Sequence, residues 1–296
     1  MTKRTTRLGI ATAAIGTLTL GLLAGCSSGD GGDTEGMNTL EKAQEEGKIT
    51  LAIASEQPYS WVEDGEPTGA TIAMHEQIFK NLGIDDIEIE EVDWNSLIPG
   101  LNAGRWDAVS AGMSILPERC AEAAFSDPEI MYTTTLVVAK DNPKKLSDLD
   151  SVAAAGDVTL AVQSGAIEEG YATDLGIGNT IQVDSAQAGI EVVQSGRADA
   201  FALTAVSLNW MTEDMDDVET TEAFVQEIDG VEQIGAGATV FRQEDSDLLE
   251  AYNEELAKIT GDEGTYLDLV EPFGFTAENL PPEDLTTEQL CSGELG

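Results

Sequence analysis

Hydrophobic residues along the chain follow two spacings in turn, one typical of buried strands and one typical of helices. Residues 48–55 (KITLAIAS) form a short apolar, β-branched run that predicts a buried strand. Residues 71–82 have apolar positions at helical spacing and are stopped by Gly83, which predicts a helix. Further elements in this first block are strands at 87–92 and 105–111 and a short helix at 96–103.

The same pattern restarts after an extended segment at 132–140 (YTTTLVVAK). Strands alternating with helices indicate parallel β-α-β units, so the chain is expected to hold two such blocks in succession. The elements expected in the rest of the chain are strands at 158–163, 180–183 and 198–203, helices at 166–175, 185–195, 248–260 and 263–270, and an extended segment at 233–242.

Two long extended segments, at 132–140 and 233–242, are placed to cross between the blocks. Two crossings predict an α/β protein of two lobes, with a hinge and a cleft in which small molecules bind. We expect the first lobe to comprise residues 38–134 and 238–296, and the second lobe to comprise residues 135–237.

The N-terminus has the organisation of a secretory signal. Three basic residues precede an uncharged apolar stretch at 8–25, and Leu23-Ala24-Gly25-Cys26 matches a bacterial lipobox. We expect a signal peptide over 1–25, lipidation of Cys26 and a flexible polar tether over 26–37. The protein would then be exported and anchored to the outer face of the cell membrane. The alternative is an ordinary signal peptide with an incidental cysteine.

The charge balance is strongly acidic. Among 296 residues, 56 are Asp or Glu and 14 are Lys or Arg, giving a net charge of −42. A field of this sign repels nucleic acid and anionic lipid, so neither is expected as a partner. A solvated acidic surface on an exported protein indicates a salt-rich medium, as in a halophile.

Cys120 and Cys291 are the cysteines that remain after Cys26. An even pair in an oxidising compartment predicts a disulfide, with two free thiols as the alternative. The single histidine, His75, lies on a helix expected at the surface, and there is no Cys/His cluster. No nucleophile–base pair, P-loop or dinucleotide motif occurs either, so we expect no metal, no cofactor and no enzymatic activity.

Three stretches carry a resemblance to a known family. They are DAVSAGMSILPER (107–119), in which a small-residue turn precedes an Arg, then FSDP (125–128) and GRADA (196–200). In this order they resemble the polar-solute-binding family of ABC importers. The resemblance implies a type II periplasmic-binding fold, a clamshell with two hinge crossings. It also implies a small zwitterionic solute and an ABC permease as partners, with the protein acting as a monomer.

Shorter motifs resemble the ectoine- and hydroxyectoine-binding subgroup of that family. They are PERC (117–120), AIEEGYA (166–172), EPFGF (271–275) and EQLC (288–291). The subgroup shares a Cys after the Arg and another at the C-terminus. This resemblance implies that the protein takes up a compatible solute for osmoprotection.

Ectoine carries a carboxylate and a delocalised cationic ring, and a receptor must supply partners for both. Arg119 is the expected carboxylate partner, because its planar fork matches a carboxylate bidentately. The alternative is an Arg119 paired with Glu118 or Glu122 on an exposed helix. Gly112 belongs to the small-residue turn that precedes this arginine.

The cationic ring needs a negative group and aromatic faces. By resemblance, Glu56 pairs with the ring cation, and Tyr59 and Trp94 supply two aromatic faces, each contributing ~1–2 kcal/mol. Glu56 and Tyr59 follow the first strand at its carboxyl end, where α/β folds bind ligands.

Two positions depart from the ectoine subgroup. Ser114 stands where the subgroup tends to have a third aromatic, and Ala166 where it has a hydroxyl residue. Ser114 instead resembles amino-acid receptors, whereas Thr204 stands where those receptors place an Asp for the α-ammonium group. A polar amino acid is therefore the alternative ligand, and an aromatic box could be rebuilt from Trp61 or Met113.

The second lobe is expected to close over the solute. Ser164, Gly165 and Ala166 lie between a predicted strand and a helix start, where backbone N–H groups can face a ligand. The first lobe would bind the solute and the second would then bury it, giving the form that a permease recognises.

The acidic surface predicts that stability depends on salt. Raising NaCl to about 1 M shortens the Debye length to about 3 Å and screens the repulsion among carboxylates. We expect the melting temperature to rise steadily over this range. A melting temperature that stays flat would contradict the interpretation of a surface adapted to brine.

Overall fold

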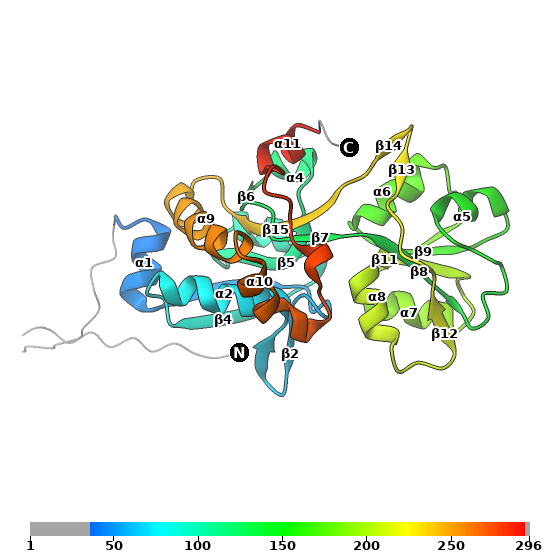
Figure 1. Ribbon diagram of the computed structural model, residues 1–296, viewed down its shortest axis with the longest axis horizontal. Coiled ribbons are helices and arrows are strands. Elements are labelled where there is room, and N and C mark those ends of the chain that lie inside the picture. Colours follow the sequence, from blue (N-terminus) through cyan, green and yellow to red (C-terminus); the bar gives the residue numbers. More distant parts are fainter. Residues whose placement is uncertain (1–35, 294–296) are drawn as a thin grey trace, which may run out of the picture. The chain divides into compact units, whose positions relative to one another are not determined.

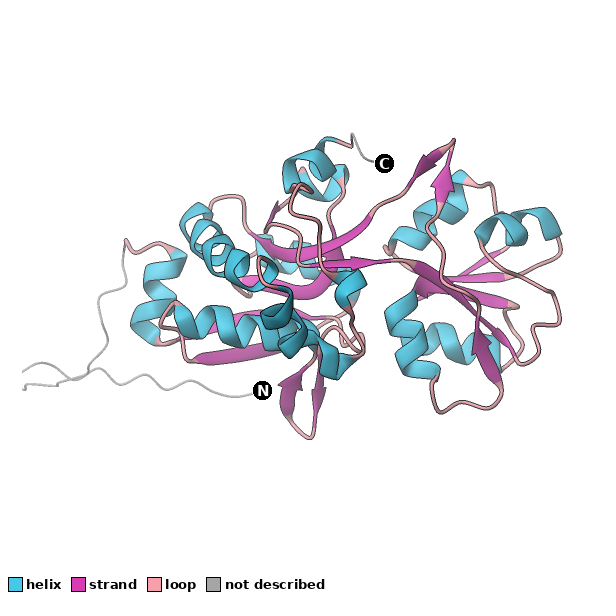
Figure 2. Cartoon of the chain, in the orientation of Figure 1, coloured by secondary structure: helices cyan, strands magenta, loops and turns pink. Residues whose placement is uncertain are grey.

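The computed structural model describes residues 36–293, and these residues form two α/β lobes, each built on its own sheet (Figures 1 and 2). The expected signal peptide (1–25), Cys26 and most of the tether lie outside the described residues. Within residues 36–293, no helix is both long enough and apolar enough to cross a bilayer.

The sheet of the first lobe has the strand order β4-β1-β5-β15-β6, and β7 also pairs with β15. β1 runs parallel to β4 and to β5, whereas β15 is antiparallel to β5. β15 is buried along its whole length, while β4 at the sheet edge is not buried at any position. The strands are β1 (Lys48–Ile53), β4 (Asp86–Glu91), β5 (Ala108–Ser114), β6 (Ala124–Phe125), β7 (Ile130–Tyr132) and β15 (Gly235–Phe241).

Helices cover this sheet, and the small hairpin β2 (Trp61–Glu63) and β3 (Glu66–Thr68) follows β1. One hydrophobic cluster joins α2, α9 and α10 to β1, and a second joins α3 to the other side of β5. A disulfide between Cys120 and Cys291 joins α4 to α11. The helices are α1 (Thr39–Glu46), α2 (Ala70–Asn81), α3 (Leu97–Asn102), α4 (Pro117–Cys120), α9 (Ser246–Thr260), α10 (Glu263–Val270) and α11 (Thr287–Ser292).

The sheet of the second lobe has the order β10-β9-β11-β8-β12. β9 runs parallel to β10 and β11, and β8 is antiparallel to β11 and β12. Its strands are β8 (Thr134–Ala139), β9 (Leu160–Gln163), β10 (Thr180–Val183), β11 (Ala200–Thr204) and β12 (Val218–Thr220). Its helices are α5 (Leu149–Ala155), α6 (Ile167–Asp174), α7 (Ala186–Gln194) and α8 (Ala205–Thr212).

The chain passes between the two sheets twice, and both passages can be followed in Figure 1. The first passage is at Thr133, between β7 in the first sheet and β8 in the second. The single strand expected at 132–140 is therefore two strands in different lobes. The second passage follows β12 through the hairpin β13 (Glu227–Ile228) and β14 (Val231–Glu232) into β15.

His75 is not at the surface, contrary to the sequence-based expectation. It lies on α2 with an exposed fraction of 0 %, and its Nε2 is 2.7 Å from Oγ1 of Thr239. Burial lowers the pKa of His75 to about 3. Its helix packs against α9 and α10, so the side chain belongs to the core of the first lobe.

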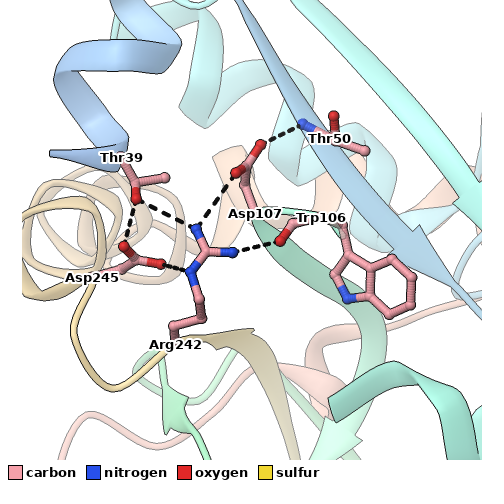
Figure 3. Close-up of polar contacts among 6 residues, drawn as sticks. All are labelled: Thr39, Thr50, Trp106, Asp107, Arg242 and Asp245. Carbon is pink, nitrogen blue, oxygen red and sulfur yellow. Dashed lines mark hydrogen bonds and ion pairs between the residues drawn. The ribbon is translucent and has the colours of Figure 1, made fainter. Parts of the chain in front are cut away.

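A polar network around Arg242 ties β15 to the start of β5 and to α9 (Figure 3). The guanidinium donates to the carbonyl of Trp106 at 2.6 Å and pairs with Asp245 at 2.6 Å and Asp107 at 3.5 Å. The Arg242 side chain has an exposed fraction of 12 %. A charge so far removed from water is stabilised only if its partners stay in place.

The carboxylates of this network hold further elements in position. The backbone N–H of Thr50 on β1 donates to Asp107, and the hydroxyl of Thr39 on α1 donates to Asp245. The network therefore joins α1 and β1 near the N-terminal end of the described chain to β5 and to the later pair β15 and α9.

Replacing Arg242 tests how much the first lobe depends on this network. Arg242→Met leaves two carboxylates without their cation, so we expect a loss of about 3 kcal/mol in the free energy of unfolding. The exposed pair of Lys140 and Glu219 offers a control, and Lys140→Met should cost less than about 1 kcal/mol. Urea denaturation of both variants measures the difference, and equal losses would contradict this role of Arg242.

Candidate functional site

A small cavity lies between the two lobes, with a volume of about 20 Å³. That is room for about one water molecule, so the lobes must separate to admit a larger solute. Seven of the nine predicted ligand-binding residues line it, while Arg119 and Ser164 are not in its lining. The lining from the first lobe includes Glu56, Tyr59, Trp94, Gly112, Ser114 and Tyr132, and that from the second includes Gln163, Ala166, Ile167, Glu168 and Thr204.

The ring of Tyr59 packs directly against Gly112 on the first-lobe side of the cavity. Tyr59 packs edge-on against Phe275, with ring centroids 5.3 Å apart, and also against Tyr132. A Cβ atom on Gly112 would lie 2.5 Å from the Tyr59 ring, and the φ of Gly112 is +54°. Only glycine therefore lets the Tyr59 ring lie against β5 at this point.

Arg119 and Trp94 reach the second lobe through the same acceptor. Nη2 of Arg119 donates to the carbonyl oxygen of Gly165 at 2.7 Å, and Nε1 of Trp94 donates to that oxygen at 3.1 Å. The guanidinium also donates to the carbonyl of Ser114 and lies 5.6 Å from the centroid of the Trp94 ring. Arg119 is thus held over an aromatic face at the contact between the lobes.

The turn after β9 does not offer backbone N–H groups to the cavity, and the expectation for 164–166 is wrong in this respect. Gly165 accepts hydrogen bonds through its carbonyl instead, and a Cβ atom there would lie 2.3 Å from Asn95 of the first lobe. The three N–H groups are all used within the second lobe: Ser164 donates to Val183, Gly165 to Glu169, and Ala166 to Gln163. Ser164 instead receives a hydrogen bond from Asn95 through its hydroxyl, at 3.3 Å.

Glu56 is buried, and its carboxylate bonds across the cavity to the second lobe. Its Oε1 accepts from the hydroxyl of Ser207 at 2.6 Å and from that of Thr204 at 3.5 Å. Burial raises the pKa of Glu56 to about 7, although both hydroxyls oppose the rise. A buried carboxylate with neutral partners only is poised to receive a cation.

Glu168 is a second buried carboxylate in the cavity, which the sequence analysis missed. It is the second residue of α6, with an exposed fraction of 1 %. Burial raises its pKa to about 7, and the nearby Glu56 adds to the rise. Glu168 and Glu169 are adjacent in the sequence, and nothing in their spacing distinguishes the buried residue from the half-exposed one.

Three further polar residues at the cavity were also missed. The hydroxyl of Tyr132 donates to Oγ of Ser114 at 2.5 Å, Ser207 holds Glu56, and Gln163 ends β9. Tyr132 and Gln163 both occur at strand ends, a signal that could have been used. Ser207 lies inside α8, a helix absent from the sequence-based prediction.

Neither Trp61 nor Met113 lines the cavity, so an aromatic box rebuilt from them is wrong. Trp61 packs at 5.9 Å from Phe273 and 6.3 Å from Trp210 of the second lobe, measured between ring centroids. Met113 is buried in the core of the first lobe. The aromatic side chains at the cavity are Tyr59, Trp94 and Tyr132.

A larger cavity of about 960 Å³ lies beside the hinge, lined in part by Trp210, Phe273 and Glu278. Its lining includes no Lys, Arg or His, so a solute carboxylate finds no cation there. Within residues 36–293, no cluster of three metal-ligating side chains is present. The lining of the small cavity also has no Lys, Arg or His, but the guanidinium of Arg119 bonds to Gly165, next to the lining residue Ala166. A cation therefore lies close to the two carboxylates of the small cavity, as a zwitterion requires.

Comparison with known proteins places the chain among transport proteins. The family described as bacterial extracellular solute-binding proteins, family 3, matches residues 49–276. A probable amino-acid ABC transporter periplasmic-binding protein of Sinorhizobium fredii is 34% identical over 264 residues, 87% of each chain. The arginine-binding extracellular protein ArtP of Bacillus subtilis is 26% identical, over 86% of this chain and 93% of its own.

The crystal structure of EhuB in complex with hydroxyectoine is also similar. It has a TM-score of 0.76 and 32% identity, and the match covers 86% of this chain and 97% of that one. The two-lobed fold expected from the sequence is confirmed, and the named relatives are solute-binding proteins rather than enzymes.

The raised pKa of Glu56 predicts how stability depends on pH. The ordinary glutamate pKa is 4.5 and the folded value is about 7, so the folded protein loses stability as pH rises between these values. Glu56→Gln removes this loss, and we expect it to gain about 3 kcal/mol relative to wild type at pH 8, but little at pH 4.5. Urea denaturation at both pH values measures the gain.

The exposed Glu191 on α7 provides a matched control for this substitution. Glu191→Gln should change the free energy of unfolding by less than about 0.5 kcal/mol at either pH. A gain for Glu56→Gln that is the same at pH 4.5 and pH 8 would contradict the assignment.

Proposed function

The chain belongs to family 3 of the bacterial extracellular solute-binding proteins, and we propose that it binds ectoine or hydroxyectoine and delivers it to an ABC importer. More broadly, it is a solute-binding protein of an amino-acid-type ABC importer, not an enzyme. The observation that carries the proposal is a cavity with the carboxylate of Glu56 and two aromatic faces in its lining, beside a guanidinium. The hydroxyectoine complex of EhuB, at 32% identity, supports the same ligand class.

Arg119 is proposed to hold the carboxylate of the solute. In the closed form its guanidinium donates to two backbone carbonyls, of Ser114 and Gly165. A carboxylate is a better acceptor than a carbonyl for a bidentate guanidinium, because the hydrogen bonds are then charge-assisted on both sides. A solute that separates the lobes slightly can therefore replace the Gly165 oxygen.

Glu56, Tyr59 and Trp94 are proposed to receive the cationic ring. A delocalised ring cation spreads its charge over a plane, which suits contact with aromatic faces. Thr204 supports this choice, because its hydroxyl bonds to Glu56 where a carboxylate would otherwise serve an α-ammonium group. Gly112 lets the Tyr59 ring lie against β5, and Ala166 gives the opposite lobe a small side chain at the cavity.

A polar amino acid is the second candidate solute. Ser114 favours it, since a serine hydroxyl at this strand end can accompany Arg119 on an α-carboxylate. Similarity to the arginine-binding protein of Bacillus subtilis, at 26% identity, points to the same class.

The cellular setting is proposed from the sequence and the family together. The family is extracellular, in agreement with an exported protein held at the outer face of the membrane by lipidated Cys26. We propose that it acts as a monomer with lobes at 38–134 with 238–296 and at 135–237. The strand pairings support a division close to this one, with β8 beginning at Thr134 in one sheet and β15 beginning at Gly235 in the other.

Calorimetric titration of the soluble form tests the ligand directly. We expect tight binding of ectoine or hydroxyectoine, and weak or no binding of glycine betaine, arginine and glutamine. Arg119→Ala should abolish binding, and Trp94→Ala should weaken ectoine binding roughly tenfold by removing a desolvated cation–π contact.

Arg105 is an exposed arginine in the same lobe, so Arg105→Ala serves as the control and should bind like wild type. Tight binding of an amino acid with no response to ectoine would reject the proposed ligand and leave the fold unaffected.

A further inference from the structure

The geometry points to Glu168 as a second cation-binding carboxylate, which shares the two N–H groups of an amidinium ring with Glu56. This inference rests on the proposed function and assigns the second lobe a part in selecting the solute. Glu168 lines the cavity and is 1 % exposed, and its Oε1 has no hydrogen-bond partner among residues 36–293. A buried carboxylate oxygen without a hydrogen bond raises the free energy of the protein unless a ligand donates one to it.

The charges around the cavity are unbalanced before a solute binds. Arg119 is the guanidinium that acts on both Glu168 and the nearby Tyr132, whereas the cavity lining holds two carboxylates, Glu56 and Glu168. The remaining titratable groups that influence Glu168 or are influenced by it are the phenols of Tyr59, Tyr132 and Tyr171. A solute carboxylate that neutralises Arg119 therefore leaves two carboxylates for the cationic part of the solute.

The two carboxylates belong to different lobes. Glu56 follows β1, and Glu168 lies near the start of α6, so both come together only in the closed form. An amidinium has two N–H groups that point away from a shared carbon and can each meet one carboxylate. A quaternary ammonium has no N–H group, and so it cannot satisfy either oxygen in this way.

Binding of an amidinium should also displace protons. Burial raises the pKa of both carboxyls to about 7, and the nearby Glu56 adds to the rise for Glu168, so each is partly protonated at neutral pH. A cation placed between them favours the ionised forms and releases protons to the solvent. Affinity for the solute should then fall as pH is lowered from 8 to 6, by up to about tenfold per pH unit for each proton released.

The test uses calorimetry with ectoine on wild type and Glu168→Gln, at pH 6, 7 and 8, in two buffers of different ionisation enthalpy. We expect Glu168→Gln to weaken ectoine binding at least about tenfold at pH 8 and to release fewer protons at pH 7. Weak binding of glycine betaine should not change. Glu168→Asp, which keeps the charge on a shorter side chain, should show an intermediate affinity. Its affinity tests the inference if the Gln variant folds poorly.

Glu129 offers a matched control, because it is also a buried glutamate but bonds to Ser126, Thr239 and Tyr252 within the first lobe. Glu129→Gln should leave ectoine affinity and proton release as in wild type. If wild type binds ectoine and Glu168→Gln binds it equally tightly with the same proton release, the inference is wrong and the proposed function stands. If wild type binds neither ectoine nor hydroxyectoine, the proposed function itself fails, and this role of Glu168 fails with it.

Discussion

Burial of charge between the lobes is the constraint on which the rest of the structure depends. Glu56 and Glu168 lie out of water in one small cavity, and the guanidinium of Arg119 lies beside it. Isolated charges in such a place are costly, so each must be held by dipoles until a ligand arrives. The carbonyls of Ser114 and Gly165 do this for Arg119, and the hydroxyls of Ser207 and Thr204 do it for Glu56. Glu168 has the least complete set of partners.

The acid-rich composition makes the few buried cations structurally important. Arg242 and Arg119 occupy comparable positions, each surrounded by acceptors from elements that are far apart in sequence. Around Arg242 the partners include two carboxylates, so its network is permanently neutralised and serves the fold. Around Arg119 the acceptors are neutral carbonyls, so the positive charge stays available to a solute. The same side chain thus has a structural or a binding role according to its acceptors.

The sequence predicted most of the architecture because hydrophobic spacing reports the buried face of each element. The strand at 180–183 and the helix at 263–270 agree with β10 and α10 at both ends. The break at Thr133 was not predictable, because the extended pattern of residues continues through it and only tertiary pairing separates β7 from β8. His75 shows the same limit. In the sequence it is a polar residue at a helical position, which is typical of a surface residue, and only the packing of α9 and α10 buries it. Within the site, Glu56 and Tyr59 followed from a strand end and Arg119 from a family motif. Glu168 and Ser207 required knowledge of how the lobes face each other.

The contact between Tyr132 and Ser114 links the site to the hinge. Tyr132 is the last residue of β7 before the chain leaves the first lobe, and its Cα partner on β15 is Gly235, where the chain returns. Ser114 pairs with Gly237, two residues further along the same strand. Ser114 at the cavity is therefore connected by a single hydrogen bond to the residue at which the chain leaves the first lobe. Tyr132 thus serves the site and the hinge at once, because its side chain lines the cavity and its backbone begins the first passage between the lobes.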